Sequence, residues 1–236
     1  MLSVQRITSY AARSSDKNEF TMPLIIHCAD IGSVYRGNFG WARLAVDEPD
    51  AVCTTGHDIG VFADGIASDL NSGAHVAVGF ECPLFLPVPE DPNGLTSARP
   101  GEGDRAWSAG AGAGSLATGL TETVWILERV KRKISAAPAV FVKWQAFRAA
   151  TGGLFVWEAF VTKAAKTDTH HGDAELAVMS FRDGLPDPEQ QNAVICNGPV
   201  RSLIGAALMQ AGWANELKWL AESCLVIRAL PRGGAA

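Results

Sequence analysis

The sequence predicts one α/β domain built on a mixed β-sheet with helices on both faces. Three strand-like segments come first, and helical and strand segments then alternate, an order that gives both parallel and antiparallel neighbours in a sheet. The 236 residues suffice for one large domain, or for two small ones at most. With 47% apolar and only 19% charged residues, the chain does not have the composition of a disordered protein.

The chain is expected to begin with a polar lead-in over residues 1–22, followed by the domain over residues 23–236. Residues 24–29 are mostly apolar and end at Asp30-Ile31-Gly32-Ser33, which is typical of a buried strand. A turn containing glycine leads from there to residues 38–46, so we predict a hairpin, and residues 51–55 fit a third, short strand.

A helix, a strand and a long loop are predicted next. Apolar residues recur at helical spacing over residues 59–70, and Gly73 follows the helix end. Residues 74–80 are an apolar run that fits a strand. Residues 83–108 hold five prolines with several glycines and acids, so we predict an irregular loop insertion. We expect this loop to lie over the carboxyl ends of the strands as a lid that is more mobile than the core.

The second half of the chain is predicted to alternate helices with one or two strands. The Gly-Ala stretch at residues 109–114 leads into a helix that ends near Ile134; we interpret its small residues as close helix packing, because the Lys-Ser/Thr of a phosphate loop is absent. Pro138 begins another predicted helix, residues 154–161 fit a strand, and a helix is expected from His170 to about Arg182. Residues 186–236 are predicted to be a C-terminal helical extension, with helices at 200–211 and from Asn215 and a last strand at 224–230.

Composition and charge exclude several classes of protein. No apolar run reaches the roughly 18 residues that a membrane span needs, and the N-terminus lacks the order of a secretory signal. The five scattered cysteines form no CxxC pair, which argues against a disulfide scaffold or zinc knuckle and favours a cytoplasmic location. A net charge of -5 argues against tight non-specific binding to DNA. The same charge is compatible with an enzyme that binds a phosphate group through metal ions.

Acidic residues stand in or directly after strands that are otherwise apolar. Asp30 ends the first strand, Glu81 ends the strand at 74–80, and Glu158 lies inside the strand at 154–161. A lone buried carboxylate is costly or is forced to protonate, so three of them need a shared reason, and a divalent cation that offsets their repulsion is the simplest. A fourth acid, Asp173, stands at a helix start, where the helix dipole favours negative charge.

We therefore predict that Asp30, Glu81, Glu158 and Asp173 are catalytic, and that Asp30, Glu81 and Asp173 hold Mg²⁺ or Mn²⁺. We expect the carboxyl groups of Asp30 and Glu81 on neighbouring strands, within a metal-bridging distance of roughly 4–6 Å. Each acid also has a structural alternative: a turn cap at Asp30, an ion pair of Glu81 with Arg99 or Arg105, a solvent-facing edge position for Glu158 and a helix N-cap at Asp173.

Other candidate residues have simpler structural interpretations. We interpret His170 and His171 as exposed residues of a helix start and His27 as a hydrogen-bonded core residue. The basic residues between Arg129 and Lys133 are interpreted as a solvated helix end that complements the helix dipole, with nucleic-acid binding as the alternative.

Several segments resemble, in their order along the chain, the blocks of the RNase H-like superfamily. The hairpin from Ala29-Asp30-Ile31-Gly32-Ser33 to Gly40-Trp41-Ala42 resembles the opening of such a domain. Residues 78–87, with Glu81 where the usual residue is Asp, resemble the second acidic strand of a predicted-nuclease family called domain of unknown function 429. Similar to its later blocks are Arg105-Ala106-Trp107, Val156-Trp157-Glu158 and His170-His171-Gly172-Asp173-Ala174. The resemblance spans residues 24–185 and implies a central mixed five-stranded sheet with an acidic site at the strand ends.

Three functions remain open on the sequence. The first is a metal-dependent phosphodiesterase or nuclease that acts on nucleic acid or nucleotides. The second is an ATP-dependent phosphotransfer domain of the sugar-kinase/actin type, since Asp30-Ile31-Gly32-Ser33 resembles its first phosphate motif; the chain has no second Asp-x-Gly strand for the partner domain that such proteins need. The third is a non-catalytic scaffold with an RNase H-like fold. The oligomeric state is left open.

Overall fold

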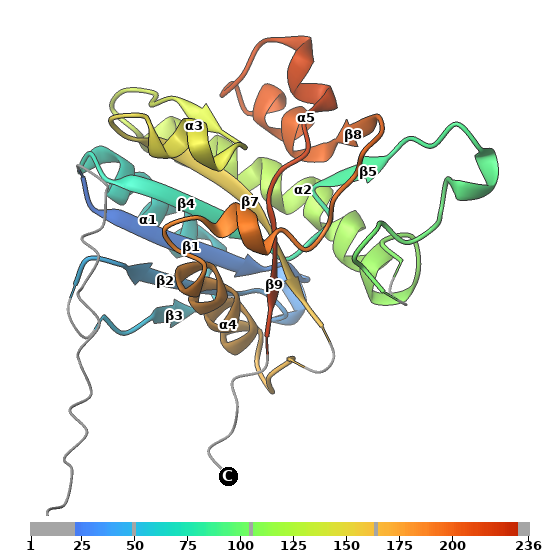
Figure 1. Cartoon of the computed structure of the whole chain (residues 1–236). Helices are drawn as coiled ribbons and strands as arrows, with labels where there is room; N and C mark the ends of the chain where they lie inside the picture. Colours follow the sequence, from blue (N-terminus) through green and yellow to red (C-terminus); the bar gives the residue numbers. More distant parts are fainter. Residues whose placement is uncertain (1–21, 49–50, 104–105, 163–164, 231–236) are drawn as a thin grey trace, which may run out of the picture.

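A seven-stranded mixed sheet lies at the centre of the computed structural model, which describes residues 22–48, 51–103, 106–162 and 165–230 (Figure 1). Its strand order is β3-β2-β1-β4-β7-β6, and β9 also pairs with β7. The strands are β1 (Leu24–Asp30), β2 (Gly40–Ala45), β3 (Thr54–Gly56), β4 (His75–Phe80), β6 (Val140–Phe141), β7 (Gly153–Val161) and β9 (Val226–Ala229).

The sheet is mixed because its first three strands are antiparallel and the others are parallel. β2 pairs antiparallel with β1 and β3, whereas β4 is parallel to β1 and to β7. The sheet of the described chain has seven strands rather than the expected five, because β6 and β9 share one edge of the long strand β7. β6 pairs with its beginning, at Leu154, and β9 pairs with its end, from Glu158 onward.

Helices cover both faces of this sheet, as predicted. α1 (Ile59–Asn71), α2 (Gly110–Lys133) and α5 (Leu203–Gln210) contribute to the core on one face, which we call the α2 face (Figure 1). α4 (His170–Asp183) and the short α3 (Trp144–Arg148) pack on the opposite face, the α4 face. Successive side chains of β1 point to opposite faces of the sheet, so this strand contributes to both cores. Ile25 and Ala29 lie on the α2 face, and Ile26 and Cys28 lie on the α4 face.

His27 agrees with its sequence interpretation, whereas the basic end of α2 forms ion pairs that its interpretation as a solvated helix end did not include. His27 on β1 is buried, and its Nε2 lies 2.7 Å from Asp69 Oδ2 on α1, so it is a hydrogen-bonded core histidine. The basic end of α2 is also paired: Arg129 and Lys133 both contact Asp64 on α1, at 2.8 and 2.7 Å. These contacts join α1 to the sheet and to α2.

The structure differs from the sequence prediction at two places. The helix expected from Pro138 is replaced by β6 and the five-residue α3, because Val140 and Phe141 pair with β7. Residues 83–108 are not wholly irregular: β5 (Phe85–Pro87) pairs antiparallel with β8 (Val200–Ser202), and a 3₁₀ turn lies at η2 (Pro92–Gly94). Other 3₁₀ turns lie outside this loop, at η1 (Val34–Arg36) before it and at η3 (Pro188–Gln191) and η4 (Leu217–Ala221) after it. The C-terminal region is therefore partly strand, and β9 belongs to the main sheet.

A close approach between β2 and α4 depends on glycine. A Cβ atom at Gly40 would lie 2.3 Å from the backbone nitrogen of His171, so no larger residue fits there without a shift of α4. This contact places the first turn of α4 beside the end of β1. The expected lead-in falls almost entirely in residues 1–21, which lie outside the described residues. None of the helices described here is both long and apolar enough to cross a membrane.

Candidate metal centre

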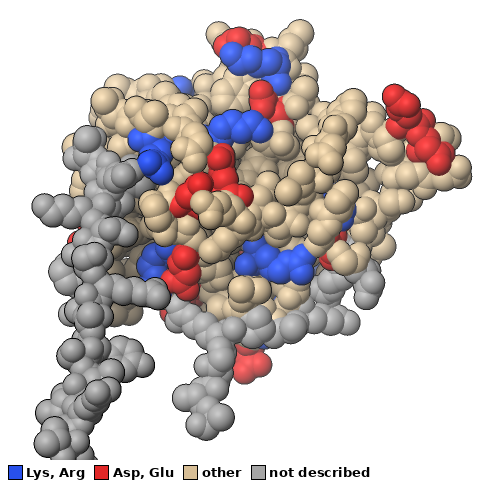
Figure 2. Space-filling model, viewed as in Figure 1, with Lys and Arg blue, Asp and Glu red and all other residues tan. Residues whose placement is uncertain are grey.

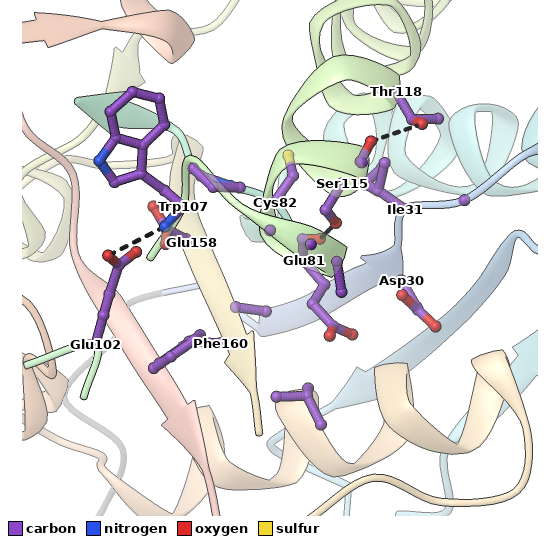
Figure 3. A pocket seen from close by; sticks show the side chains of 18 of the residues that line it. Asp30, Ile31, Glu81, Cys82, Glu102, Trp107, Ser115, Thr118, Glu158 and Phe160 are labelled. Carbon is purple, nitrogen blue, oxygen red and sulfur yellow. Dashed lines mark hydrogen bonds between the residues drawn. The ribbon is translucent and has the colours of Figure 1, made fainter. Parts of the chain in front are cut away.

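Three carboxylates converge at the carboxyl ends of β1 and β4. Asp30 is the last residue of β1, Glu81 follows β4 directly, and Asp173 lies in the first turn of α4. Each offers a carboxylate oxygen, and these oxygens all lie within 4.8 Å of one another. The expected proximity of Asp30 and Glu81 on neighbouring strands is therefore confirmed, and Figure 3 shows both side chains extending toward the same space.

The register of the two strands explains this convergence. Ala29 is paired with Phe80, and the amide of Glu81 donates to the carbonyl of Ala29 at 2.8 Å, so the ladder continues to the two acids. Both side chains project to the α4 face, since Asp30 follows the phase of Cys28 and Glu81 follows the phase of Ala77. The site is thus built by the ends of two parallel strands and closed by the start of α4.

Glu158 lies apart from this group, on the opposite face of the sheet. It follows the phase of Leu154 and Val156, which belong to the core of the α2 face. Its carboxylate forms a bidentate ion pair with Arg99, at 2.9 and 2.5 Å, and also accepts from the amide of Leu84 at 2.9 Å. Arg99 therefore pairs with Glu158, whereas the structural alternative had paired it with Glu81.

Arg99 anchors the loop insertion to the sheet. Its backbone and side chain also bind Glu102, both at 2.7 Å, and its guanidinium donates to the carbonyl of Phe85 at 3.1 Å. Arg99 is only 2% exposed, so these contacts fix the second half of the loop insertion, around Arg99 and Glu102, in the protein interior, whereas residues 90–97 are mostly exposed. The loop lies next to the carboxyl ends of the strands, where the lid was expected, but it is held there by buried ion pairs.

Two further side chains that sequence reasoning did not assign to the site, a lysine and a histidine, contact the three acids. Lys166 Nζ lies 3.0 Å from Asp173 Oδ2 and 3.5 Å from Glu81 Oε1. His170 Nδ1 is hydrogen-bonded to Asp30 Oδ2 at 2.6 Å, so this residue is more than an exposed helix start. The sequence signal for both was their closeness to Asp173, seven and three residues before it, in a polar stretch without strand or helix periodicity.

Asp173 is not the N-cap of its helix. The N-cap is Thr169, whose hydroxyl accepts from the amide of Gly172 at 3.1 Å. One Asp173 oxygen instead accepts from the amide of Thr167 at 2.6 Å, and the other faces Lys166. The carboxylate is 3% exposed and thus held rigidly at the edge of the centre.

Burial and mutual repulsion shift the pKa values of the acids in this centre. Burial raises the pKa of Glu81 well above its ordinary range, and the negative charge of Asp30 raises it further. Burial also raises the pKa of Asp30, although the hydrogen bond from His170 and the charge of Lys166 oppose this. Burial alone would lower the pKa of Lys166, but the charges of Glu81, Asp30 and Asp173 outweigh it, and the net effect is a raised pKa.

This donor set fits a hard divalent cation. The group consists of carboxylate oxygens, which Mg²⁺ and Mn²⁺ prefer over nitrogen or sulfur ligands. Among the described residues, Glu81 Oε2 is shielded from solvent and has no donor as a hydrogen-bond partner, so it needs either a proton shared with Asp30 or a bound cation. The chemistry of the site therefore agrees with the predicted metal ligands Asp30, Glu81 and Asp173.

The chain matches no protein-family model, and comparisons with curated proteins and with solved structures likewise find no match.

A cavity of about 750 Å³ adjoins the carboxylates and is the space in which a substrate can meet them. Asp30, Glu81, Lys166 and His170 line one side of it. The other side is formed by the loop insertion and the small residues at the start of α2, including Trp107, Gly110, Gly112 and Ser115 (Figure 3). Ser115 also holds the strand end in place, because its hydroxyl donates to the carbonyl of Glu81 at 2.8 Å.

Proposed function

We propose that this protein is a metal-dependent phosphodiesterase of the RNase H-like type, acting on nucleotides or nucleic acid. The observation that supports this most strongly is the convergence of Asp30, Glu81 and Asp173, with ligand oxygens within 4.8 Å of one another, beside a cavity. A mixed sheet with an acidic site at the strand ends is also what the resemblance to RNase H-like domains implies.

In this proposal, the three carboxylates hold Mg²⁺ or Mn²⁺. When bound, such an ion activates water for attack and stabilises the charge on a phosphodiester. Lys166 supplies a further positive charge to a phosphate that enters the cavity. The hydrogen bond from His170 Nδ1 to Asp30 orients the imidazole, which leaves Nε2 as the ring nitrogen that can take or give a proton.

The turn after β1, which would bind phosphate in the phosphotransfer alternative, gives that alternative less support. The amides of Gly32 and Val34, which would have to face a phosphate in that function, lie against the carboxylate of Glu122 on α2 and oppose the rise that burial causes in its pKa. In the scaffold alternative, the buried carboxyl of Glu81 would depend on a proton shared with Asp30 instead of on a cation. The first observation favours the metal-dependent hydrolase over phosphotransfer, and metal binding distinguishes it from the scaffold.

Metal dependence of the melting temperature (Tm) tests the proposal. Millimolar Mn²⁺ should raise the Tm, because an ion that binds only the folded chain stabilises it, at roughly 2–4 °C per kcal/mol for a chain of this size. Asp30→Asn should abolish most of this rise, since it removes a ligand charge without removing volume. Mn²⁺-dependent hydrolysis of bis(p-nitrophenyl) phosphate should be lost in the same variant.

The matched control is Glu175→Gln, an acid on the same helix as Asp173 but outside the three-carboxylate group. This variant should respond to Mn²⁺ like the native protein. A native Tm that is indifferent to Mn²⁺ would favour the scaffold, and an Asp30→Asn protein with a native response would show that other acids bind the metal.

A further inference from the structure

Lys166 occupies a place in the centre that a metal ion would otherwise take. Its ammonium lies 3.0 Å from Asp173 and 3.5 Å from Glu81, and so bridges two of the three carboxylates. The Lys166 side chain is 39% exposed, whereas those of Asp173 and Glu81 are 4% and 13% exposed, so the ammonium reaches the acids from the solvent side. We propose that Lys166 replaces a second cation, so that this centre binds a single divalent ion; the inference rests on the proposed function.

The charges in the centre support one ion rather than two. When a metal ion is bound and all three carboxylates are ionised, they carry three negative charges, of which Lys166 offsets one. A single divalent cation balances the remaining two. A second divalent ion would give the centre an excess of positive charge before a phosphate enters, and the ammonium would repel that ion at short range.

The hydrogen bonds at Asp173 support the same conclusion. A two-ion centre needs carboxylates that are free to bind or bridge both ions. At Asp173, however, one oxygen accepts from the amide of Thr167 at 2.6 Å and the other faces Lys166 at 3.0 Å. The oxygen without any partner belongs to Glu81, beside Asp30. All three acids can therefore contribute to one ion, with the charge of Asp173 already offset by Lys166 and the unpartnered oxygen of Glu81, beside Asp30, marking where that ion binds.

The consequence is that the lysine sets both the number of ions and their affinity. A resident positive charge weakens the binding of a nearby divalent cation, but it also keeps the acids compatible with burial when no metal is present. Removing the charge should therefore destabilise the metal-free protein and tighten its hold on metal. Replacing lysine by arginine should preserve the charge balance.

Mn²⁺ titration of the metal-free full-length protein, followed by isothermal calorimetry and electron paramagnetic resonance, tests this proposal. The native protein and Lys166→Arg should bind one Mn²⁺ per chain. Lys166→Met should bind the first Mn²⁺ roughly tenfold more tightly, because about 1.4 kcal/mol of repulsion is removed. The same variant should accept a second Mn²⁺ and show a larger rise in Tm on metal addition.

The control is Lys143→Met, since Lys143 pairs with Glu222 at 3.4 Å and takes no part in the centre. It should bind one Mn²⁺ with native affinity. Two ions of similar affinity in the native protein, or unchanged or weaker binding by Lys166→Met, would overturn the inference. If the native protein binds two ions and Asp30→Asn binds none, the proposed role of Lys166 is wrong but the proposed function still holds. If neither the native protein nor any variant binds Mn²⁺, the role of Lys166 and the proposed function are both wrong. Should Lys166→Met fail to fold, as judged by circular dichroism, Lys166→Gln provides the same comparison.

Discussion

At the scale of single residues, the acids that the sequence grouped together have different partners in the structure. Asp30 and Glu81 share the α4 face, but Glu158 lies on the α2 face and binds Arg99. Removing one partner of a buried ion pair leaves an uncompensated charge and typically costs about 3–5 kcal/mol. The Glu158–Arg99 pair therefore belongs to the stability of the loop insertion and the sheet.

We predict that Glu158→Gln lowers the free energy of unfolding by about 3 kcal/mol or more and leaves the Mn²⁺-dependent rise in Tm intact. Denaturant titration with and without Mn²⁺ measures both quantities. Arg182→Met, which removes an exposed ion pair with Asp183, serves as the control and should change stability by less than about 1 kcal/mol. Loss of the metal response in Glu158→Gln would place this acid in the metal set after all.

The residue scale also shows how far the sequence could predict the site. Asp30 and Glu81 could be found because both end apolar strands, and parallel neighbours bring such ends together. Because side chains alternate between the two faces of a strand, the sequence placed Glu158 on the same face as Val156. Only the pairing of Phe80 with Glu158 shows that this face of the sheet is opposite to the face of Asp30. Lys166 and His170 lacked any such pattern, since Lys166 lies in the turn before α4 and His170 is the first residue of α4, and both reach across to the ends of the strands.

At the scale of elements, α2 contacts the turn between β1 and β2 through an ionisable side chain, Glu122. Burial raises the pKa of the Glu122 carboxyl from 4.5 to about 7, although the nearby amides of Val34 and Gly32 favour its ionised form. A raised pKa means that the ionised form weakens the fold. The stability that protonated Glu122 provides is therefore lost as the pH rises from about 4.5 through about 7.

We predict that Glu122→Gln is more stable than the native protein at pH 8, by on the order of 1 kcal/mol once solvent screening is considered, and nearly equal to it at pH 4.5. The glutamine oxygen can still accept from both amides, so the difference reports the charge. Urea denaturation at the two pH values measures it. Glu128→Gln, on the same helix but more exposed, should show no such divergence; an identical pH dependence of native protein and Glu122→Gln would contradict the prediction.

Elements with long, regular patterns were predictable, and short ones that depend on distant partners were not. The apolar period of α1 and the runs of β1, β4 and β7 are local signals, and all four lie where they were expected. β5 and β8 are three-residue strands that exist because they pair with each other across more than a hundred residues. β6 likewise became a strand through its contact with β7, which overrode the helical phase of Val140 and Phe141.

At the scale of the whole molecule, the net charge restricts the size of the phosphodiester that the proposed hydrolase can bind. The net charge is -5, and Figure 2 shows Lys and Arg as separate spots, interspersed with acids, over the face in view. Around the cavity, Arg99 is committed to Glu158 and Glu102, and Lys166 to Glu81 and Asp173. A cavity of about 750 Å³ lies within the range of small-molecule sites, so its size suits a nucleotide-sized ester.

We predict that the protein binds long nucleic acid weakly, with a dissociation constant of about 10⁻⁴ M or weaker at physiological salt. Tight polynucleotide binding depends on many Lys and Arg contacts to phosphate, which release counterions and make affinity fall steeply with salt. Fluorescence anisotropy of a labelled 20-nucleotide DNA, measured from 50 to 200 mM NaCl, gives both the affinity and the slope. The measurement is repeated with Ca²⁺, which occupies carboxylate sites without supporting rapid cleavage in many hydrolases, so that phosphate contact at the metal is included. Submicromolar binding with a steep salt slope would contradict the prediction and would make a polynucleotide, rather than a nucleotide-sized ester, the preferred substrate of the centre formed by Asp30, Glu81 and Asp173.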